Sequence, residues 1–383
     1  MPLADGFVPR ANLGQEFLAP LEIYWCSECK TVQTQHDVQV NDYYREYHYT
    51  VSTSPFVQQF MRLLVENAFE RFALQPGDNV VEIGSGDGSL LACFQNRGAR
   101  VLGYEPSVNL CRVSRQAGVP VVEGLFTADT IQRIPAEIRP IQVALLTYTF
   151  DHLFDPLAFL QTIHDALDPE RGLLIIEVHD LAKIVARREA CLFAHEHSIY
   201  LTLLTMERLL ARTGFKLLTS DLVPEISRRG NSLLVVAAPQ KSCCQAEPLE
   251  PVPDLLRLDE WQVYGNFGQE ISAAYARLGD YVRQGRRAGK RFAGYGAGGR
   301  GVLSLAMADL NQGDIAFVCD RNVNLHRLYT PRSHIPVVSP DHLSFDPVDE
   351  LVVFSTGYLG EITQQLNPYL KQGMRLTSLF DLL

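Results

Sequence analysis

A glycine-rich loop, Gly84-Ser85-Gly86-Asp87-Gly88, follows an apolar run over residues 79–83 and is the clearest candidate for a ligand site. Glycine tolerates positive φ and lets backbone amides approach a ligand closely. The next apolar run, residues 100–104, is followed by Glu105 and Pro106. An acid at the end of that strand can accept hydrogen bonds from both hydroxyls of a ribose. The two features together predict a site for a nucleoside cofactor.

Two more acids, Glu82 on the strand and Asp87 in the loop, distinguish between nucleoside cofactors. Both carboxylates would be poorly placed beside the pyrophosphate of NAD, whereas a cationic sulfonium with an amino-acid tail tolerates them well. The sequence therefore predicts an S-adenosylmethionine site and a methyltransferase. We assign cofactor binding to Glu82, Gly84, Gly86, Asp87, Gly88, Glu105 and Pro106.

The run Ala194-His195-Glu196-His197 offers a general base. Methylation of a carbon needs a carbanion-like nucleophile, which a position next to a ketone supplies after proton loss, and histidine suits that step because its pKa is near neutral. His195 and His197 would share a face in an extended segment but not in a helix. Two alternatives stay open: a metal site, for which no neighbouring residue supplies a third ligand, and histidines that are simply hydrogen-bonded at a domain junction.

A second glycine-rich turn, Gly294-x-Gly296-x-x-Gly299, matches the dinucleotide-binding pattern, with Asp320 at the end of the following strand. Arg300, at the start of the helix after this turn, would suit a phosphate group. From the residues alone, a second cofactor site for NAD and a redox function stay open.

Cys26 and Cys29 form half of a zinc site. A closed structural site needs four ligands; His36 could add one, and Cys243-Cys244 lies in a linker where it is poorly placed. We expect little or no bound zinc.

Strand-like apolar runs alternate with helical stretches from about residue 73 to residue 239, which is typical of a parallel sheet with crossover helices. The expected strands are 79–83, 100–104, 119–122, 142–147, 173–178, 216–218 and 233–237, and two of the helices are 156–167 and 205–213. A second α/β unit begins at Lys290, with strands over 291–294, 315–319 and 350–354 and helices over 301–308 and 361–370.

These elements predict an α/β protein with four regions. They are a small N-terminal lobe (1–55), a central class I (Rossmann-like) methyltransferase domain (56–240), a linker with a long helix over 261–285 (241–289), and a C-terminal Rossmann-like α/β domain (290–383).

The composition of the chain limits the classes of partner and the cellular compartment that we expect. Charged residues make up 20% of the 383 residues and the net charge is −10, which argues against a nucleic-acid partner because such proteins present a basic face. The sequence has no apolar run long enough to cross a membrane and no signal-peptide pattern at its start, so we expect a cytoplasmic protein with reduced cysteines. The oligomeric state cannot be inferred.

Over almost its whole length the chain resembles the C-methyltransferases that modify nucleotide-linked 4-keto deoxysugars in antibiotic biosynthesis. The resemblance rests on Pro20-Leu21-Glu22-Ile23-Tyr24-Trp25-Cys26-Ser27-Glu28-Cys29 and the tyrosine-rich stretch after it, on the cofactor loop, on Phe150-Asp151-His152, on Ala194-His195-Glu196-His197, on Gly294-Tyr295-Gly296-Ala297 and on Thr330-Pro331-Arg332-Ser333-His334.

That resemblance implies a methyltransferase domain flanked by a metal-binding lobe and a Rossmann-like domain, which together enclose a sugar nucleotide. It places the general base on His197, preceded by Glu196, and further active-site residues on His152 and Tyr49. It also assigns the C-terminal domain to substrate binding. As substrate-binding residues we name His195, Tyr295, Arg300, Asp320 and His334.

The sequence departs from the family in four places. The first Cys-x-x-Cys of the zinc module is absent, Ala194 replaces a tyrosine, Arg229-Gly230-Asn231 replaces His-Gly-Gly, and Ser355-Thr356-Gly357-Tyr358 replaces a Trp-Asn segment. The first departure affects the expectation of zinc binding, and the other three affect the expected identity of the substrate. We therefore expect methylation of a carbon next to a carbonyl on a nucleotide-linked or similarly phosphorylated small molecule, with an O- or N-methyltransferase as the alternative.

Overall fold

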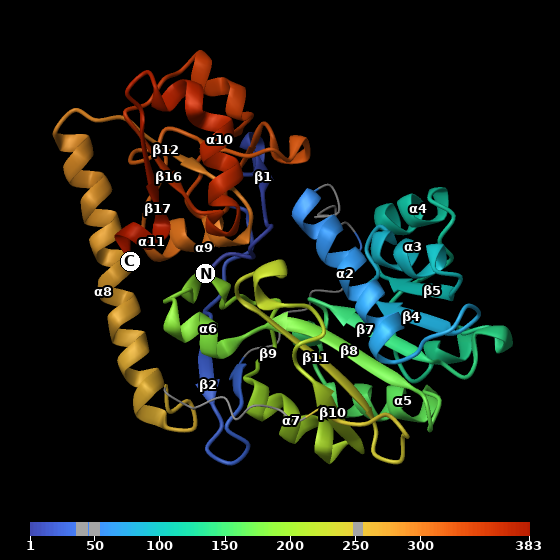
Figure 1. Cartoon of the computed structure of the whole chain (residues 1–383). Helices are drawn as coiled ribbons and strands as arrows, with labels where there is room; N and C mark the ends of the chain where they lie inside the picture. Colours follow the sequence, from blue (N-terminus) through green and yellow to red (C-terminus); the bar gives the residue numbers. More distant parts are fainter. Residues whose placement is uncertain (36–44, 46–53, 248–255) are drawn as a thin grey trace.

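The computed structural model describes residues 1–35, 45, 54–247 and 256–383, and it contains two large sheets flanked by helices (Figure 1). The larger sheet has the strand order β10-β11-β8-β7-β4-β5-β6. Only β11 runs antiparallel to its neighbours. Its strands are β4 (Asn79–Ile83), β5 (Arg100–Glu105), β6 (Val121–Glu123), β7 (Val143–Thr147), β8 (Leu173–His179), β10 (Phe215–Thr219) and β11 (Ser232–Pro239).

This order confirms the predicted class I methyltransferase fold. The expected strands coincide with the observed ones to within two residues at each end. β4 and β7 are neighbours in the sheet, and the strand order runs outward from this pair in opposite directions. In such sheets ligands bind at the carboxyl ends of the strands at this point of reversal. The fold therefore places a site where the glycine-rich loop leaves β4.

Helices cover both faces of this sheet because successive strand residues point to opposite sides. Val80 packs with α2 (Pro55–Arg71) and α3 (Ser89–Asn96), while its neighbour Val81 packs with α5 (Pro156–Ala166) and α7 (Leu203–Arg212). Helix α4 (Val108–Gln116) follows β5, and α6 (Leu181–Ala186) follows β8.

The second sheet is entirely parallel, with the order β15-β13-β12-β16-β17, as a Rossmann-like unit requires. Its strands are β12 (Phe292–Tyr295), β13 (Val318–Cys319), β15 (Val337–Val338), β16 (Glu350–Val353) and β17 (Arg375–Ser378). The helices around it are α8 (Trp261–Arg287), α9 (Gly299–Met307), α10 (Leu359–Leu370) and α11 (Leu379–Leu382). The sequence patterns missed β15, which is only two residues long, and β17, which is short and carries polar residues.

The N-terminal segment contacts both units. Its strand β1 (Val8–Pro9) pairs with β14 (Leu328–Tyr329). The hairpin β2 (Ile23–Trp25) and β3 (Val32–Thr34) is extended by β9 (Ile199–Tyr200), which follows the His-Glu-His run. The described part of the first 55 residues therefore joins the two units. No helix in the described ranges is long and apolar enough to span a membrane.

Candidate active site

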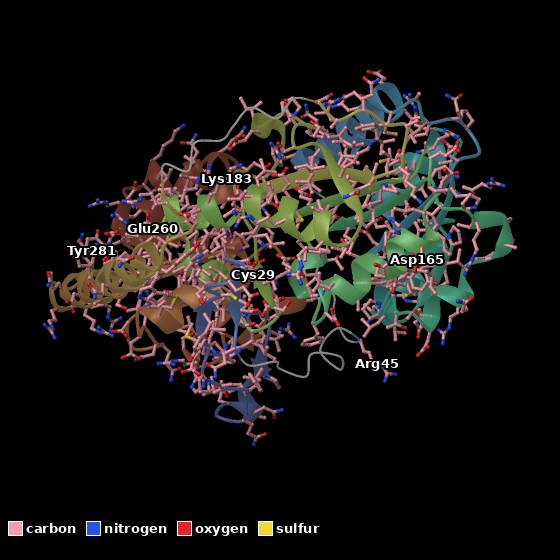
Figure 2. The ribbon with its side chains drawn as sticks, turned by 90° about the horizontal axis from the view of Figure 1, so that it is seen from below. Cys29, Arg45, Asp165, Lys183, Glu260 and Tyr281 are labelled. Carbon is pink, nitrogen blue, oxygen red and sulfur yellow. The ribbon has the colours of Figure 1, made fainter. Side chains whose placement is uncertain are left out.

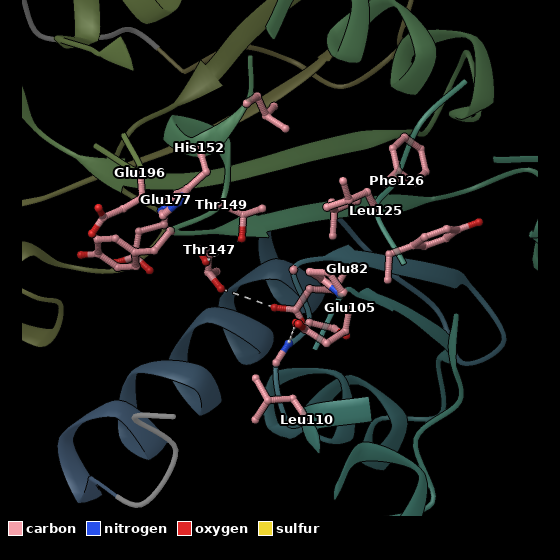
Figure 3. Close-up of a pocket in the computed structure, with 18 of the residues that line it drawn as sticks. Glu82, Glu105, Leu110, Leu125, Phe126, Thr147, Thr149, His152, Glu177 and Glu196 are labelled. Atoms are coloured by element: carbon pink, nitrogen blue, oxygen red, sulfur yellow. Dashed lines mark hydrogen bonds between the residues drawn. The ribbon is translucent and has the colours of Figure 1, made fainter. Parts of the chain in front are cut away.

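A cavity of about 730 Å³ lies at the carboxyl ends of β4, β5, β7 and β8. Figure 3 shows Glu82, Glu105 and Phe126 toward one end of it and His152 and Glu196 toward the other. The cavity therefore joins the cofactor loop to the predicted catalytic run. The predicted site residues that line it are Glu82, Gly84, Gly86, Asp87, Glu105, Pro106, His152, Glu196 and His197.

The glycine-rich loop adopts a backbone that side chains would disturb. Gly84, Gly86 and Gly88 have φ values of 73°, 54° and 80°, in the left-handed region that favours glycine. A Cβ on Gly84 would lie 2.2 Å from the hydroxyl oxygen of Thr149. Gly88 precedes α3 and does not line the cavity, so its role is to shape the turn rather than to contact a ligand.

Glu105 fixes the loop from the neighbouring strand. One carboxylate oxygen accepts a hydrogen bond from the Gly86 amide and the other from the Ser107 amide, each at 2.8 Å. Burial raises the pKa of the Glu105 carboxyl, and these two hydrogen bonds oppose that rise. Since each carboxylate oxygen has a second lone pair, Glu105 can still accept bonds from two ribose hydroxyls.

The residues present fit S-adenosylmethionine. Glu82 is 2% exposed, and its Oε2 has no hydrogen-bond partner among the described residues. Burial raises the pKa of its carboxyl well above the ordinary range, with smaller contributions from Asp87 and Glu105. A cationic ligand would offset the cost of three carboxylates in one cavity. Leu125 and Phe126 add an apolar wall at the Glu105 end, which suits a flat base.

We expect Glu105→Ala to weaken binding of S-adenosylhomocysteine by about 1–3 kcal/mol, since charge-assisted hydrogen bonds to a ribose would be lost. Calorimetric titration would measure this, with Glu123→Ala as the control because Glu123 ends the next strand and is exposed. Equal affinity in the parent and Glu105→Ala proteins would show that this loop does not hold the nucleoside.

Three histidines and an aspartate meet at the other end of the cavity. Asp151 Oδ2 lies 2.9 Å from His179 Nδ1, and Asp151 Oδ1 lies 3.8 Å from His152 Nε2. The ring of His197 lies 4.8 Å from that of His152 and 4.9 Å from that of His179. Burial alone would raise the pKa of the Asp151 carboxyl, but the hydrogen bond with His179 and the other two histidines lower it. A buried carboxylate thus faces three imidazoles.

Burial lowers the pKa of His152 to about 3 and that of His179 to about 4, against the opposing effect of Asp151. Both rings are therefore neutral at neutral pH. Asp151, His152 and His197 each place a ligand atom within 4.8 Å of the others. These three residues could therefore supply ligands to a metal ion, which keeps open the metal alternative raised by the His-Glu-His run, whereas a closed zinc site needs a fourth ligand.

His197 is held in one tautomer. Its Nδ1 lies 2.9 Å from the carbonyl oxygen of Leu192, and a carbonyl can only accept, so Nδ1 carries the proton. The lone pair is then on Nε2, and the side chain lines the cavity. This is the arrangement that a general base needs.

The backbone on either side of His197 is fixed by hydrogen bonds to distant segments. Thr34 Oγ1 on β3 donates to the His197 carbonyl at 3.1 Å. The Ser198 amide donates to the Asp151 carbonyl at 2.8 Å, which joins the segment that holds His197 to the segment that holds His152.

The His-Glu-His run is a turn rather than an extended strand or a helix, closed by a bond from the His197 amide to the Ala194 carbonyl at 3.2 Å. His195 consequently points to the N-terminal segment, where its Nε2 lies 3.3 Å from the Met1 carbonyl. Among the described residues, then, His195 and His197 do not share a metal site. Glu196 lines the cavity and its Oε2 has no described hydrogen-bond partner.

The residues that we assigned to substrate binding, His195, Tyr295, Arg300, Asp320 and His334, do not line the cavity. Tyr295 donates to Gln365 Oε1 at 2.7 Å, and His334 Nε2 lies 2.5 Å from Glu16 Oε1. Arg300 pairs with Glu189. Their roles in substrate binding stay predictions.

Asp320 repeats the arrangement of Glu105 in the second sheet. Its carboxylate accepts hydrogen bonds from the amides of Ala297 and Asn322, each at 2.8 Å. Gly298, the N-cap of α9, and Gly299, its first residue, line the cavity. The C-terminal unit therefore contributes backbone, rather than the predicted side chains, to the cavity wall.

The N-terminal residues divide into described and undescribed parts. Tyr49 and His36, which we named as a catalytic residue and a potential zinc ligand, lie outside the described residues. Cys26 and Cys29 face each other across the turn of the β2–β3 hairpin, where the Cys29 amide donates to Cys26 Sγ at 3.5 Å. Among the described residues no other ligand joins this pair.

Sequence reasoning missed several residues of the cavity and of the histidine cluster beside it. Asp151 and His179 gave a usable signal, because one directly precedes His152 and the other directly follows the predicted strand over residues 173–178. Arg229, whose guanidinium carbon lies 4.3 Å from the centre of the Tyr148 ring, stood out only as a departure from the family's His-Gly-Gly turn, and we assigned it no role. Phe56 and Phe60 on α2 also line the cavity, from a helix that was not predicted.

Comparison with known proteins finds matches along almost the whole chain. Three family models match successive parts of the chain, described as "Putative zinc binding domain" over residues 1–44, "Methyltransferase domain" over residues 56–220 and "C-methyltransferase C-terminal domain" over residues 221–379.

Among curated proteins, the C-methyltransferase NovU of Streptomyces niveus is 29% identical over 98% of this chain and 89% of its own length. An uncharacterized methyltransferase of Oceanobacillus iheyensis is 26% identical over 43% of this chain and 67% of its own. Among solved structures, a methyltransferase of Thermotoga maritima, titled a possible histamine N-methyltransferase, is 21% identical over 49% of this chain and 92% of its own, with a TM-score of 0.34.

The glycine-rich loop with its acids, the strand order and the matching family models all indicate the same cofactor and the same class of reaction. The chain is therefore an S-adenosylmethionine-dependent methyltransferase that matches the C-methyltransferase family over almost its whole length.

Proposed function

We propose that the chain methylates a carbon next to a ketone on a nucleotide-linked deoxysugar, or on a similarly phosphorylated small molecule, with His197 as the general base. The observation that carries this proposal is the hydrogen bond from His197 Nδ1 to the Leu192 carbonyl, which leaves a basic Nε2 at the cavity that also contains Glu105.

The reaction begins with proton transfer from the acceptor carbon to His197 Nε2. The resulting imidazolium lies beside the ionised Asp151, whose negative charge stabilises it. His152 and His179 stay neutral beside them, so they add no competing positive charge. S-adenosylmethionine, when bound, supplies the methyl group that forms the new carbon–carbon bond as its bond to sulfur breaks.

Two further side chains of the cavity suit such an acceptor. Arg229 is the one arginine or lysine among the described residues that line the cavity, so it is the candidate to stabilise the negative charge that develops on the ketone oxygen. Glu196, which precedes the base, presents a carboxylate that can accept a hydrogen bond from a sugar hydroxyl.

A nucleotide-linked acceptor is supported by the C-terminal unit. Gly298 and Gly299 bring the amino end of α9 to the cavity wall, and backbone amides at a helix start favour an anionic group. The match to the C-methyltransferase NovU extends through this unit.

Calorimetric titrations with S-adenosylhomocysteine, dTDP and NAD would test the proposal on the parent protein. We expect S-adenosylhomocysteine and dTDP to bind together, because the cofactor loop and the start of α9 are separate parts of the lining of one cavity. Binding of NAD in place of dTDP would instead favour a second cofactor site and redox chemistry in the C-terminal unit.

A further inference from the structure

The loop that holds the general base is attached to the C-terminal unit. Leu192, whose carbonyl binds His197 Nδ1, ends the short helix η5 (Ala190–Leu192). Ala190, Cys191 and Ala194 are buried in one apolar core with Leu303 of α9. The position of the base therefore depends on a helix that lies more than a hundred residues further along the chain.

A single ion pair accompanies this packing. Arg300, the second residue of α9, donates from Nη1 to Glu189 Oε1 at 2.8 Å and to Thr356 Oγ1 at 3.2 Å. Glu189 is the residue before η5 and is 3% exposed. Its amide donates to the Ile184 carbonyl at 3.0 Å, and its carbonyl accepts from the Leu192 amide at 2.9 Å.

We infer that Arg300 and Glu189 are positioning residues that hold η5, and through the Leu192 carbonyl hold His197, in the geometry needed for proton transfer. This inference rests on the proposed function of His197. It gives Arg300 a task other than binding a substrate phosphate, for which the guanidinium would have to line the cavity.

Because the ion pair between Arg300 and Glu189 is buried, we expect its loss to displace His197. Among the described residues, the second oxygen of Glu189, Oε2, has no hydrogen-bond partner, so Arg300 is the main compensation for a buried negative charge. Without Arg300 the carboxylate would have to move toward water, and η5 would move with it. A shift of about 1 Å at a catalytic group is enough to lower turnover by up to ~100-fold.

The test compares Arg300→Gln and Glu189→Gln with the matched control Arg188→Gln. Arg188 directly precedes Glu189 in the sequence. It forms an ion pair with Glu270 at 3.1 Å, and both side chains of that pair are exposed. We expect each variant of the buried pair to lower kcat by about 10- to 100-fold with little change in the KM for a dTDP-linked 4-keto-deoxysugar, because the residues do not touch the substrate. The control should keep the parent kcat.

A readout that needs no turnover separates this inference from the proposed function. In nitrogen-15 histidine spectra of the parent protein, assigned with His197→Gln, we expect His197 to show a protected Nδ1 proton. That signal should broaden or disappear in Arg300→Gln and Glu189→Gln and persist in Arg188→Gln. If the parent shows the signal but no exchange of acceptor protons, the proposed function fails, whereas the positioning can still be judged from the spectra.

Two results would overturn the inference. One is a protected His197 signal and full kcat in both variants of the pair. The other is a raised KM in Arg300→Gln alone, which would mean that Arg300 binds the substrate. Should the glutamine variants not fold, Arg300→Lys and Glu189→Asp keep both charges and carry the same comparison, with a smaller fall in kcat expected.

Discussion

Replacing His197 by alanine is expected to lower turnover roughly 10²- to 10⁴-fold, the usual contribution of general acid–base catalysis. The reason is local: His197 lines the cavity with Nδ1 bound to the Leu192 carbonyl, so Nε2 is the basic atom at the acceptor. Affinity for S-adenosylhomocysteine should stay nearly unchanged, because Glu105 and the glycine-rich loop are on the other side of the cavity.

Exchange of the acceptor's carbon-bound proton with deuterated solvent, measured without methyl donor, is the decisive assay for this variant. The parent protein should catalyse exchange and His197→Ala should not. His195→Ala is the matched control, since His195 lies in the same turn but points to the Met1 carbonyl. Exchange that persists in His197→Ala would move the base to His152 or Tyr49.

Gly84→Ala is expected to weaken cofactor binding by about 30-fold or more. Two costs add: the left-handed backbone, with φ at 73°, disfavours alanine by about 1–2 kcal/mol, and the new Cβ would lie 2.2 Å from Thr149 Oγ1, an overlap that costs about 1–3 kcal/mol. The loop would have to move, and the Gly86 amide would move away from Glu105. Titration with S-adenosylhomocysteine measures the loss.

Two companion variants separate the two costs. Gly77→Ala has the same backbone problem, with φ at 94°, but open space around its Cβ, so it should lower stability slightly and leave cofactor affinity intact. The double change Gly84→Ala with Thr149→Ala removes the atoms in closest contact and should restore much of the affinity, judged against Thr149→Ala alone. If Gly84→Ala binds as the parent does, the loop does not approach the cofactor as described.

The cofactor half of the site could be predicted because its signals are local. A strand, a glycine-rich turn and an acid on the next strand follow one another within about thirty residues, and parallel strands bring their carboxyl ends to one edge. The structure confirms the fold and brings Glu82, Gly86 and Glu105 into one cavity.

The acceptor half depends on contacts between distant segments, which a single sequence does not reveal. The orientation of His197 is set by a turn that the pattern could not distinguish from a strand or a helix. Arg300 carries the local features of a phosphate-binding residue, but its partner Glu189 stands 111 residues earlier in the chain. The pairing of β1 with β14 was hidden for the same reason.

The position of the transferred methyl group tests the central claim most directly. The parent protein would be incubated with S-adenosylmethionine carrying an isotopically labelled methyl group and with a dTDP-linked 4-keto-deoxysugar, and the product would be examined by NMR. We predict that the label is bonded to the carbon next to the ketone, and that this product is missing with His197→Ala. A label bonded to oxygen or nitrogen would contradict carbon methylation and the role of His197 as the base that creates the nucleophile.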